Sequence, residues 1–316
     1  MTVGDRPRLP HIAAIDGLRA LAVASVFAYH ADVGWARGGF LGVDVFFVIS
    51  GFLITALLLA EWRRDAWLDV AYFWKRRALR LLPAVLVLLV GVWVVVPILA
   101  PEQAGRLQGD IRAALAYVSN WRLIFEHQSY FEAAGRPPLL QHLWSLAVEE
   151  QFYLVWPLVL WAGLGIRRTA RRLVWWILAA AVASAALMAV LYEPGTDPSR
   201  VYYGTDTRAA AILLGAALAC VWRPSATRKA PSLAGRVVLG VVGIGALAGL
   251  AWCVTTLHQF HDSCTGAASS VSPPWPRCSL RWSRTPPPRT SARRWAPGPS
   301  CGWASGPTAS TSSTGR

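Results

Sequence analysis

Two ionisable residues in the first apolar segment of the sequence have the types and the spacing to do chemistry. Arg19 and His30 are eleven residues apart, which on a helix is about three turns plus 20°, so both side chains are expected on one face. The same spacing separates them by about 16 Å along the helix axis. Asp16 stands three residues before Arg19 and can pair with it. Ionisable groups inside a membrane span are costly and therefore candidates for function.

Neither residue identifies a function by itself. An isolated histidine such as His30 is more often a helix-end residue whose ring lies at the membrane interface. An isolated Arg19 is explained by a side chain that reaches back to the cytoplasmic face. Whether Arg19 and His30 are functional therefore depends on the helices that position them and on the motifs that follow in the sequence.

Long apolar runs dominate those elements. The chain has 316 residues, of which 54% are apolar and 15% charged, against about 25% charged residues in soluble domains. A helix needs about 20 apolar residues to cross a bilayer. We therefore predict an all-α, polytopic transmembrane helix bundle of about seven spans. The predicted spans are Ile12–His30, Phe40–Ala60, Leu81–Ala100, Leu143–Gly163, Leu173–Tyr192, Arg208–Trp222 and Val237–Leu257.

Charge in the loops predicts the orientation. With a cytoplasmic N-terminus, most Lys and Arg residues of residues 1–257 fall in cytoplasmic loops, as the positive-inside bias requires. This predicts a multi-pass protein of the cell membrane whose direct partner is the lipid bilayer. The formal net charge of +14 does not indicate nucleic-acid binding, because no basic stripe lies on a soluble domain. The amphipathic stretch Ile111–Phe125 is expected at the interface or partly re-entrant.

Composition changes abruptly after about His261. Residues 261–316 contain no Ile, Lys, Glu, Phe, Tyr, Asn, Gln or Met, and they show no helical or strand period. We therefore divide the chain into a membrane domain, 1–257, and a low-complexity segment, 258–316. We interpret that segment as an out-of-frame end of a truncated chain, the alternative being a flexible extracytoplasmic tail.

Four sequence blocks then follow one another in order. The first is Asp16-Gly-Leu-Arg19 with His30, and the second runs from Gly42-Val-Asp44 through Phe46-Phe-x-Ile-Ser50-Gly-Phe-Leu-Ile54. The third is an expected turn, Arg76-Arg77-x-x-Arg80-Leu-x-Pro83, and the fourth is Ser145-Leu-x-x-Glu149-x-x-Phe152-Tyr153. A weaker fifth is Asp206-x-Arg208. In this order the blocks closely resemble the acyltransferase-3 family of membrane O-acyltransferases, whose members usually have about ten spans.

The resemblance implies transfer of an acyl group, often acetyl, from cytoplasmic acyl-CoA to a hydroxyl of an extracytoplasmic glycan or lipid-linked saccharide. The catalytic histidine of the family falls on His30, its arginine on Arg19, and the glutamate of its fourth block on Glu149. His30 can then serve as a general base or as a nucleophile, and we favour the base. Acyl-CoA is expected as a co-substrate, with no permanently bound cofactor.

Four arginines form the expected donor site. Arg suits phosphate through its planar fork, so Arg19, Arg76, Arg77 and Arg80 are predicted to bind the CoA phosphates. Topology alone would also account for the last three. The supporting motif residues are Asp16, Asp44, Ser50, Ser145, Asp206 and Arg208.

The two adjacent glutamates of the fourth block receive different expectations. Glu149 is expected either to hydrogen-bond across helices or to orient His30. Glu150 is expected to be solvated or at the lipid edge. Three glycines of the blocks, Gly17, Gly42 and Gly51, are expected to permit close helix packing.

The sequence predicts no metal site and leaves two alternatives to an active acyltransferase. None of the five Cys residues has zinc-like spacing, so no metal site is predicted. The alternatives to an active enzyme are an inactive truncated fragment of the same family and, with less support, a transporter. The acceptor, the acyl chain and the oligomeric state are not predicted.

Overall fold

Helices alone make up the regular structure that the computed structural model describes, which covers residues 11–131, 137–167, 170–222 and 232–257. The predicted all-α class is confirmed. The low-complexity segment 258–316 lies outside the described residues. The elements are α1 (Ala13–His30), η1 (Gly39–Leu41), α2 (Gly42–Asp65), α3 (Val70–Leu99), η2 (Pro101–Gln103), α4 (Ala104–Leu115), α5 (Ser119–Phe125), α6 (Leu143–Arg167), α7 (Ala170–Leu191), α8 (Ser199–Tyr203), α9 (Thr205–Val221) and α10 (Leu233–Thr256).

Four helices of the described residues are long and apolar enough to cross a membrane: Gly39–Asp65, Val70–Leu99, Arg172–Leu191 and Leu233–Thr256. The predicted count of seven spans is therefore not confirmed. The other three predicted segments are helical, but each is too short or too polar to count as a span by length and composition. The first, α1, carries Asp16 and Arg19, α6 carries two adjacent glutamates, and α9 has only 17 residues.

The predicted turn at Arg76–Pro83 is wrong. These residues lie inside α3, which begins at Val70, eleven residues before the predicted span. The carboxylate of Asp69 caps the start of the helix by accepting a hydrogen bond from the Tyr72 amide at 3.0 Å. Pro83 is accommodated within the helix, so the three arginines of this block are one helical face and not a loop.

The amphipathic stretch 111–125 is also not one segment. It is divided between α4 and α5, and Tyr117 between them has a left-handed φ of 53°. Two arginines and two acidic side chains join these short helices through ion pairs. Arg122 lies 2.9 Å from Asp110 and 2.6 Å from Glu126, and Arg106 pairs with the same two carboxylates. The segment is therefore a compact helical corner.

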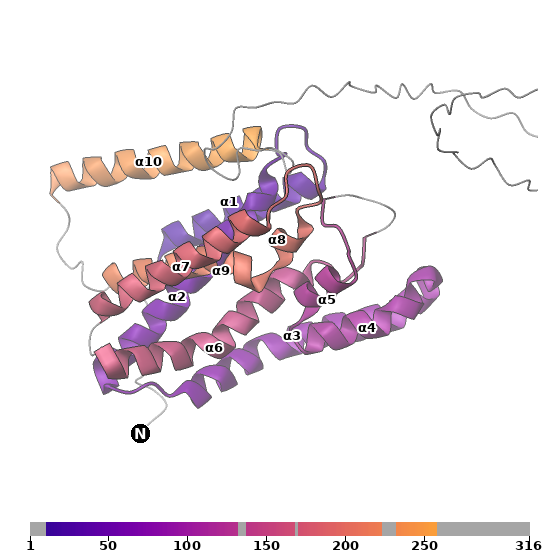
Figure 1. Cartoon of the computed structure of the whole chain (residues 1–316), viewed down its shortest axis with the longest axis horizontal. Coiled ribbons are helices and arrows are strands. Elements are labelled where there is room, and N and C mark those ends of the chain that lie inside the picture. The colour runs from indigo at the N-terminus through magenta and orange to yellow at the C-terminus, as the bar shows by residue number, and fades with distance from the viewer. Residues whose placement is uncertain (1–10, 132–136, 168–169, 223–231, 258–316) are drawn as a thin grey trace, which may run out of the picture. The chain divides into compact units, whose positions relative to one another are not determined.

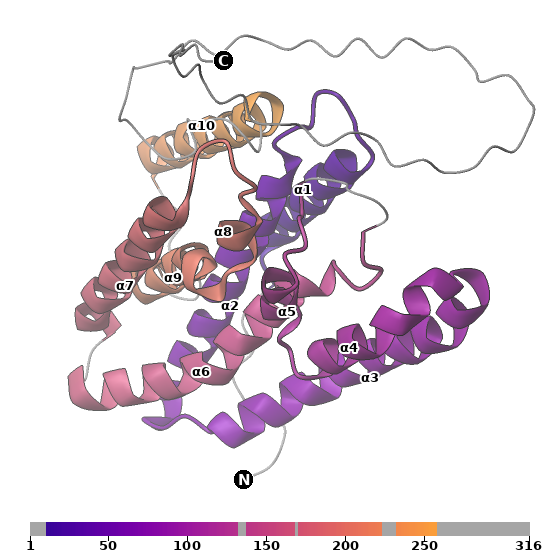
Figure 2. The same ribbon diagram turned by 45° about the vertical axis from the view of Figure 1, so that its right-hand side comes forward.

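The central helix of the bundle is α2. It contacts α1, α6 and α9, while α7 packs on α9 and α3 on α6. Figures 1 and 2 show α3 and α10 at opposite edges of this arrangement. The helices α2 and α6 run parallel, because successive contacts climb both together: Phe47 with Trp144, Ser50 with Glu149, and Thr55 with Trp156.

Two glycines bring the backbones of α2 and α9 together. A Cβ added at Gly51 would overlap the carbonyl oxygen of Ile212, and one at Gly215 would overlap that of Val48. Gly42 is similarly close to α1, at Ala22 and Ser25, whereas among the described residues no atom lies within 4 Å of a Cβ added at Gly17. The packing role predicted for Gly42 and Gly51 is confirmed, and the one predicted for Gly17 is wrong.

A methyl group at Gly215 is expected to destabilise the protein, because backbone atoms of α2 cannot move aside as a flexible side chain would. We expect Gly215→Ala to lower the free energy of unfolding by about 1–3 kcal/mol. Gly91→Ala is the matched control, since its Cβ would meet nothing within 4 Å. The measurement is thermal unfolding of the purified protein in detergent. Equal melting temperatures for the two variants would contradict the close approach.

Candidate active site

His30 lies in the last turn of α1, with an exposed side chain and one ring nitrogen already engaged. Its Nδ1 is 2.8 Å from the backbone carbonyl oxygen of Val26. A carbonyl only accepts hydrogen bonds, so Nδ1 carries the proton in this contact. The lone pair of a neutral His30 is then on Nε2, the nitrogen that points away from its own helix. The structure thus presents the arrangement that a general base needs.

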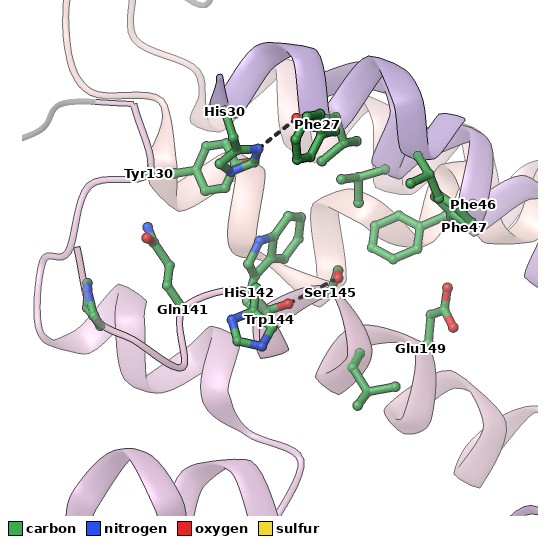
Figure 3. Close-up of a pocket in the computed structure, with 15 residues that line it drawn as sticks. Phe27, His30, Phe46, Phe47, Tyr130, Gln141, His142, Trp144, Ser145 and Glu149 are labelled. Atoms are coloured by element: carbon green, nitrogen blue, oxygen red, sulfur yellow. Dashed lines mark hydrogen bonds between the residues drawn. The ribbon is translucent and has the colours of Figure 1, made fainter. Parts of the chain in front are cut away.

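A cavity of about 640 Å³ extends from His30. Its wall is built by α1, by the start of α2, and by α6 with the segment that precedes it. Most of the lining is apolar, from side chains such as Val43, Phe47 and Leu146. Figure 3 shows His30 and Tyr130 at one end and Glu149 at the other. The two residues predicted to be catalytic therefore line one cavity but lie at separate positions in it.

Tyr130 is a site residue that the sequence did not reveal. Its hydroxyl oxygen lies 3.4 Å from His30 Nε2, although one hundred residues separate the two in the chain. The ring packs on Tyr202 with centroids 4.4 Å apart, and Trp144 and Phe131 enclose it further. No local motif marks Tyr130, because only the fold of the segment between α5 and α6 brings it to His30.

Gln141 and His142 also line the cavity and were not predicted as site residues. The Gln141 amide donates to the Tyr203 hydroxyl at 2.7 Å. Burial lowers the pKa of His142, which favours its neutral form. Their position immediately before the Ser145 block was the available signal. Ser145 itself lines the cavity, and its hydroxyl donates to the His142 carbonyl oxygen at 3.5 Å.

Glu149 hydrogen-bonds across helices, which was one of its two predicted roles. Its carboxylate accepts from the Ser50 hydroxyl of α2 at 2.9 Å and from the Tyr153 hydroxyl at 3.3 Å. The group that orients His30 is instead the Val26 carbonyl. Ser50 and Glu149, drawn from two separate sequence blocks, therefore meet at the wall of the cavity.

Glu150 is not the solvated or lipid-edge residue that was predicted. It forms an ion pair with Arg77 at 2.7 Å, and its side chain is only 12% exposed. The Arg77 guanidinium also lies over the Tyr153 ring, 3.3 Å from its centroid. The physical reason is that α3 packs against α6 and brings a cation to the carboxylate. Arg77 thus stabilises the packing of α3 against α6.

The predicted donor-site arginines are only partly gathered. Arg76, Arg77 and Arg80 line a second cleft, of about 120 Å³, together with Glu61 and Tyr72. Arg19 does not line this cleft. It lies on α1, where it is 3.8 Å from Asp16 as the sequence predicts, and Asp16 also contacts His11 at 2.6 Å.

Three supporting motif residues form ion pairs and do not line the cavity. Asp44 of α2 binds Arg208 of α9 at 2.8 Å, and Arg208 also donates to the Tyr202 carbonyl oxygen. Asp206 instead pairs with Arg200, at 2.8 Å. The described residues include no group of three His, Cys, Asp or Glu side chains that could hold a metal ion.

The sequence matches the acyltransferase domain family over residues 12–273. It is 48% identical over 233 residues to the peptidoglycan O-acetyltransferase OatA of Listeria monocytogenes, covering 74% of this chain and 38% of that protein. It is 45% identical over 238 residues to the O-acetyltransferase OatA of Staphylococcus aureus, covering 75% of this chain and 39% of that protein. The chain thus spans less than two fifths of the length of these relatives. No solved structure matches it significantly.

Removal of one partner from the Asp44–Arg208 pair is expected to destabilise the fold, because it leaves a charge buried without compensation. The Arg208 side chain is 9% exposed and that of Asp44 is 25% exposed. We expect Asp44→Ala to cost about 3 kcal/mol in unfolding free energy. The double variant Asp44→Ala/Arg208→Met should lose less than the sum of the two single variants. Strictly additive losses in detergent unfolding experiments would show that the pair is not coupled.

Proposed function

This chain belongs to the acyltransferase-3 family, and we propose that it transfers an acetyl group from acetyl-CoA to a hydroxyl of an extracytoplasmic, peptidoglycan-like glycan. Its relatives are a peptidoglycan O-acetyltransferase and an O-acetyltransferase, which supports both the acetyl group and the class of acceptor. The observation that carries the proposal is the setting of His30: its Nδ1 is bound to a carbonyl, its Nε2 is 3.4 Å from the Tyr130 hydroxyl, and it lines a cavity large enough for the reacting groups.

In the proposed reaction, His30 takes up one proton and then releases it. As the acceptor hydroxyl oxygen attacks the thioester carbonyl carbon, the new C–O bond forms and the hydroxyl proton passes to Nε2. The C–S bond then breaks, and the CoA thiolate takes the proton, which restores neutral His30. The Val26 carbonyl supports this sequence of steps, because it keeps the Nδ1 proton in place and stabilises the imidazolium that forms.

The donor would enter from the end of α2 that lies away from His30. The arginine cleft is lined by Leu57 and Glu61 of α2, and the cavity by Phe46 and Phe47 of the same helix. Ten residues of helix, from position 47 to position 57, span about 15 Å, a distance that an extended pantetheine arm can bridge. Arg76 and Arg80 are exposed and would bind the CoA phosphates at that end.

Loss of the His30 imidazole is expected to abolish catalysis and leave the fold intact, because His30 is exposed. We expect His30→Asn to lower kcat about 100-fold or more. The measurement is thiol release from acetyl-CoA by the purified full chain with a soluble oligomer of N-acetylglucosamine as acceptor. His127→Asn is the matched control, since His127 is exposed and has a left-handed φ of 50°, which Asn tolerates.

The outcomes of that assay separate three readings. Activity that survives His30→Asn would overturn the mechanism. No turnover by the wild-type chain would favour an inactive fragment. Transport of the oligomer without thiol release would indicate a transporter.

The proposed donor site can be tested separately, through the affinity of the protein for CoA. We expect Arg80→Ala to weaken CoA binding about tenfold, because it removes a charge-assisted contact to phosphate. Arg19→Ala tests whether α1 contributes to the same site. Arg64→Ala is the control for a general change in charge, since Arg64 lies at the end of α2 and pairs with Asp65 at 2.6 Å. The measurement is calorimetric titration with CoA. Unchanged affinity in both Arg19→Ala and Arg80→Ala would defeat the proposed donor site.

A further inference from the structure

We propose that a small cavity between α4, α5 and the segment before α6 binds a water molecule, held by Ser119, Asp110 and Gln141, and that this water positions the Gln141 wall of the large cavity at His30. The site does not depend on the proposed acyl transfer, and its test requires no turnover. None of the three residues belongs to the four sequence blocks.

The first argument is a buried hydroxyl that lacks a partner. Ser119 begins α5, and in the part of the chain that the structure describes its hydroxyl makes no hydrogen bond. The residue is only 6% exposed, so bulk solvent does not supply the missing partner. Buried polar groups in folded proteins are nearly always hydrogen-bonded, and internal water serves where the protein offers no group of its own. The Ser119 hydroxyl therefore calls for a small polar ligand beside it.

The second argument is the size and charge of the space next to this hydroxyl. Ser119 lines a cavity of about 10 Å³, and the other polar side chains of its wall belong to Asp110, Arg122 and Gln141. Such a volume is at the lower limit for a water molecule, about 10–15 Å³, and it excludes phosphate or a sugar ring. The Arg122 guanidinium lies 2.9 Å from the Asp110 carboxylate and neutralises it. The cavity thus offers no net negative charge to a cation, and a neutral ligand the size of water fits.

The third argument is that the polar groups match the donors and acceptors of water. The Ser119 hydroxyl can donate to the water oxygen, and the Asp110 carboxylate can accept one water hydrogen. The Gln141 amide nitrogen uses its two hydrogens on the Tyr203 hydroxyl, at 2.7 Å, and on the Ser129 carbonyl oxygen, at 3.3 Å. Its Oε1 can therefore accept the second water hydrogen. These groups give about three hydrogen bonds, the usual number for a buried water.

The water would join α5 to the wall of the large cavity. Pro138 and Gln141 line both cavities, and Figure 3 shows Gln141 at the end of the large cavity where His30 lies. The segment forms a turn, because the Gln141 amide donates to the Pro138 carbonyl oxygen and the Trp144 amide to that of Gln141, both at 3.0 Å. Ser119 is therefore a positioning residue, which acts on Gln141 through the water.

Radiolytic hydroxyl labelling tests the water directly, because a short X-ray pulse splits water in place and the product oxidises the side chains that touch it. Leu123 and Leu140 line the small cavity and are only 4% and 3% exposed. Leu107 of α4 is the internal reference, since it is 5% exposed and does not line this cavity. In the purified full chain we expect several-fold more oxidation at Leu123 and Leu140 than at Leu107. Equal oxidation of the three leucines would overturn the water site.

Removal of the Ser119 hydroxyl tests what holds the water. Ser119→Ala should lower the oxidation of Leu123 and Leu140 several-fold, to the level of the reference leucine. Ser184→Ala is the matched control, because Ser184 is 7% exposed and its hydroxyl already accepts from the Ala210 amide at 3.0 Å. This control should leave the labelling unchanged. Unchanged labelling in folded Ser119→Ala would overturn the role of Ser119, and the comparison within the wild-type chain stands even if the variant does not fold.

Hydrogen exchange tests the positioning role. Without the water, the turn before α6 loses a contact to α5, so the backbone amides of residues 141–144 should exchange several-fold faster in Ser119→Ala than in the wild type. Ser184→Ala should leave their exchange rates unchanged. Loss of the label together with unchanged exchange would overturn the positioning role of Ser119.

Discussion

The close approach of α2 and α9 is the constraint on which the rest of the structure depends. Between apolar helices in a bilayer the hydrophobic effect supplies no attraction, so close packing and buried polar contacts have to hold them together. Gly51 and Gly215 remove the side chains that would keep the two backbones apart. Asp44 and Arg208 then fix the register of one helix on the other through a buried ion pair.

That register makes α2 a shared wall for three neighbours. On the side of α6, the Ser50–Glu149 and Thr55–Trp156 hydrogen bonds set the second helix parallel to it. On the side of α1, Gly42 lets the helix that carries His30 lie close. A shift of α2 along its axis would therefore displace His30 and the far end of the cavity together.

The polar groups of the site are divided by environment. His30 and Tyr130 lie at one end of the cavity, with the Tyr130 hydroxyl 3.4 Å from His30 Nε2. Glu149 is buried at the other end with its oxygens bound by two hydroxyls. Apolar side chains such as Val43 and Leu146 lie in the wall between. In the proposed acyl transfer, such a wall would shield the thioester from water.

The sequence by itself determined the helical class, the family and the position of His30, because these depend on local composition and on motifs read in order. It also determined the Asp16–Arg19 pair, since three residues on one helix suffice to bring them together. Only the tertiary structure decided that Tyr130 reaches His30 and that Glu150 is neutralised by Arg77. It also decided that Gly51 is packed while Gly17 is not. Each of these outcomes joins segments distant in the chain, and helical periodicity cannot say which faces of two helices will meet.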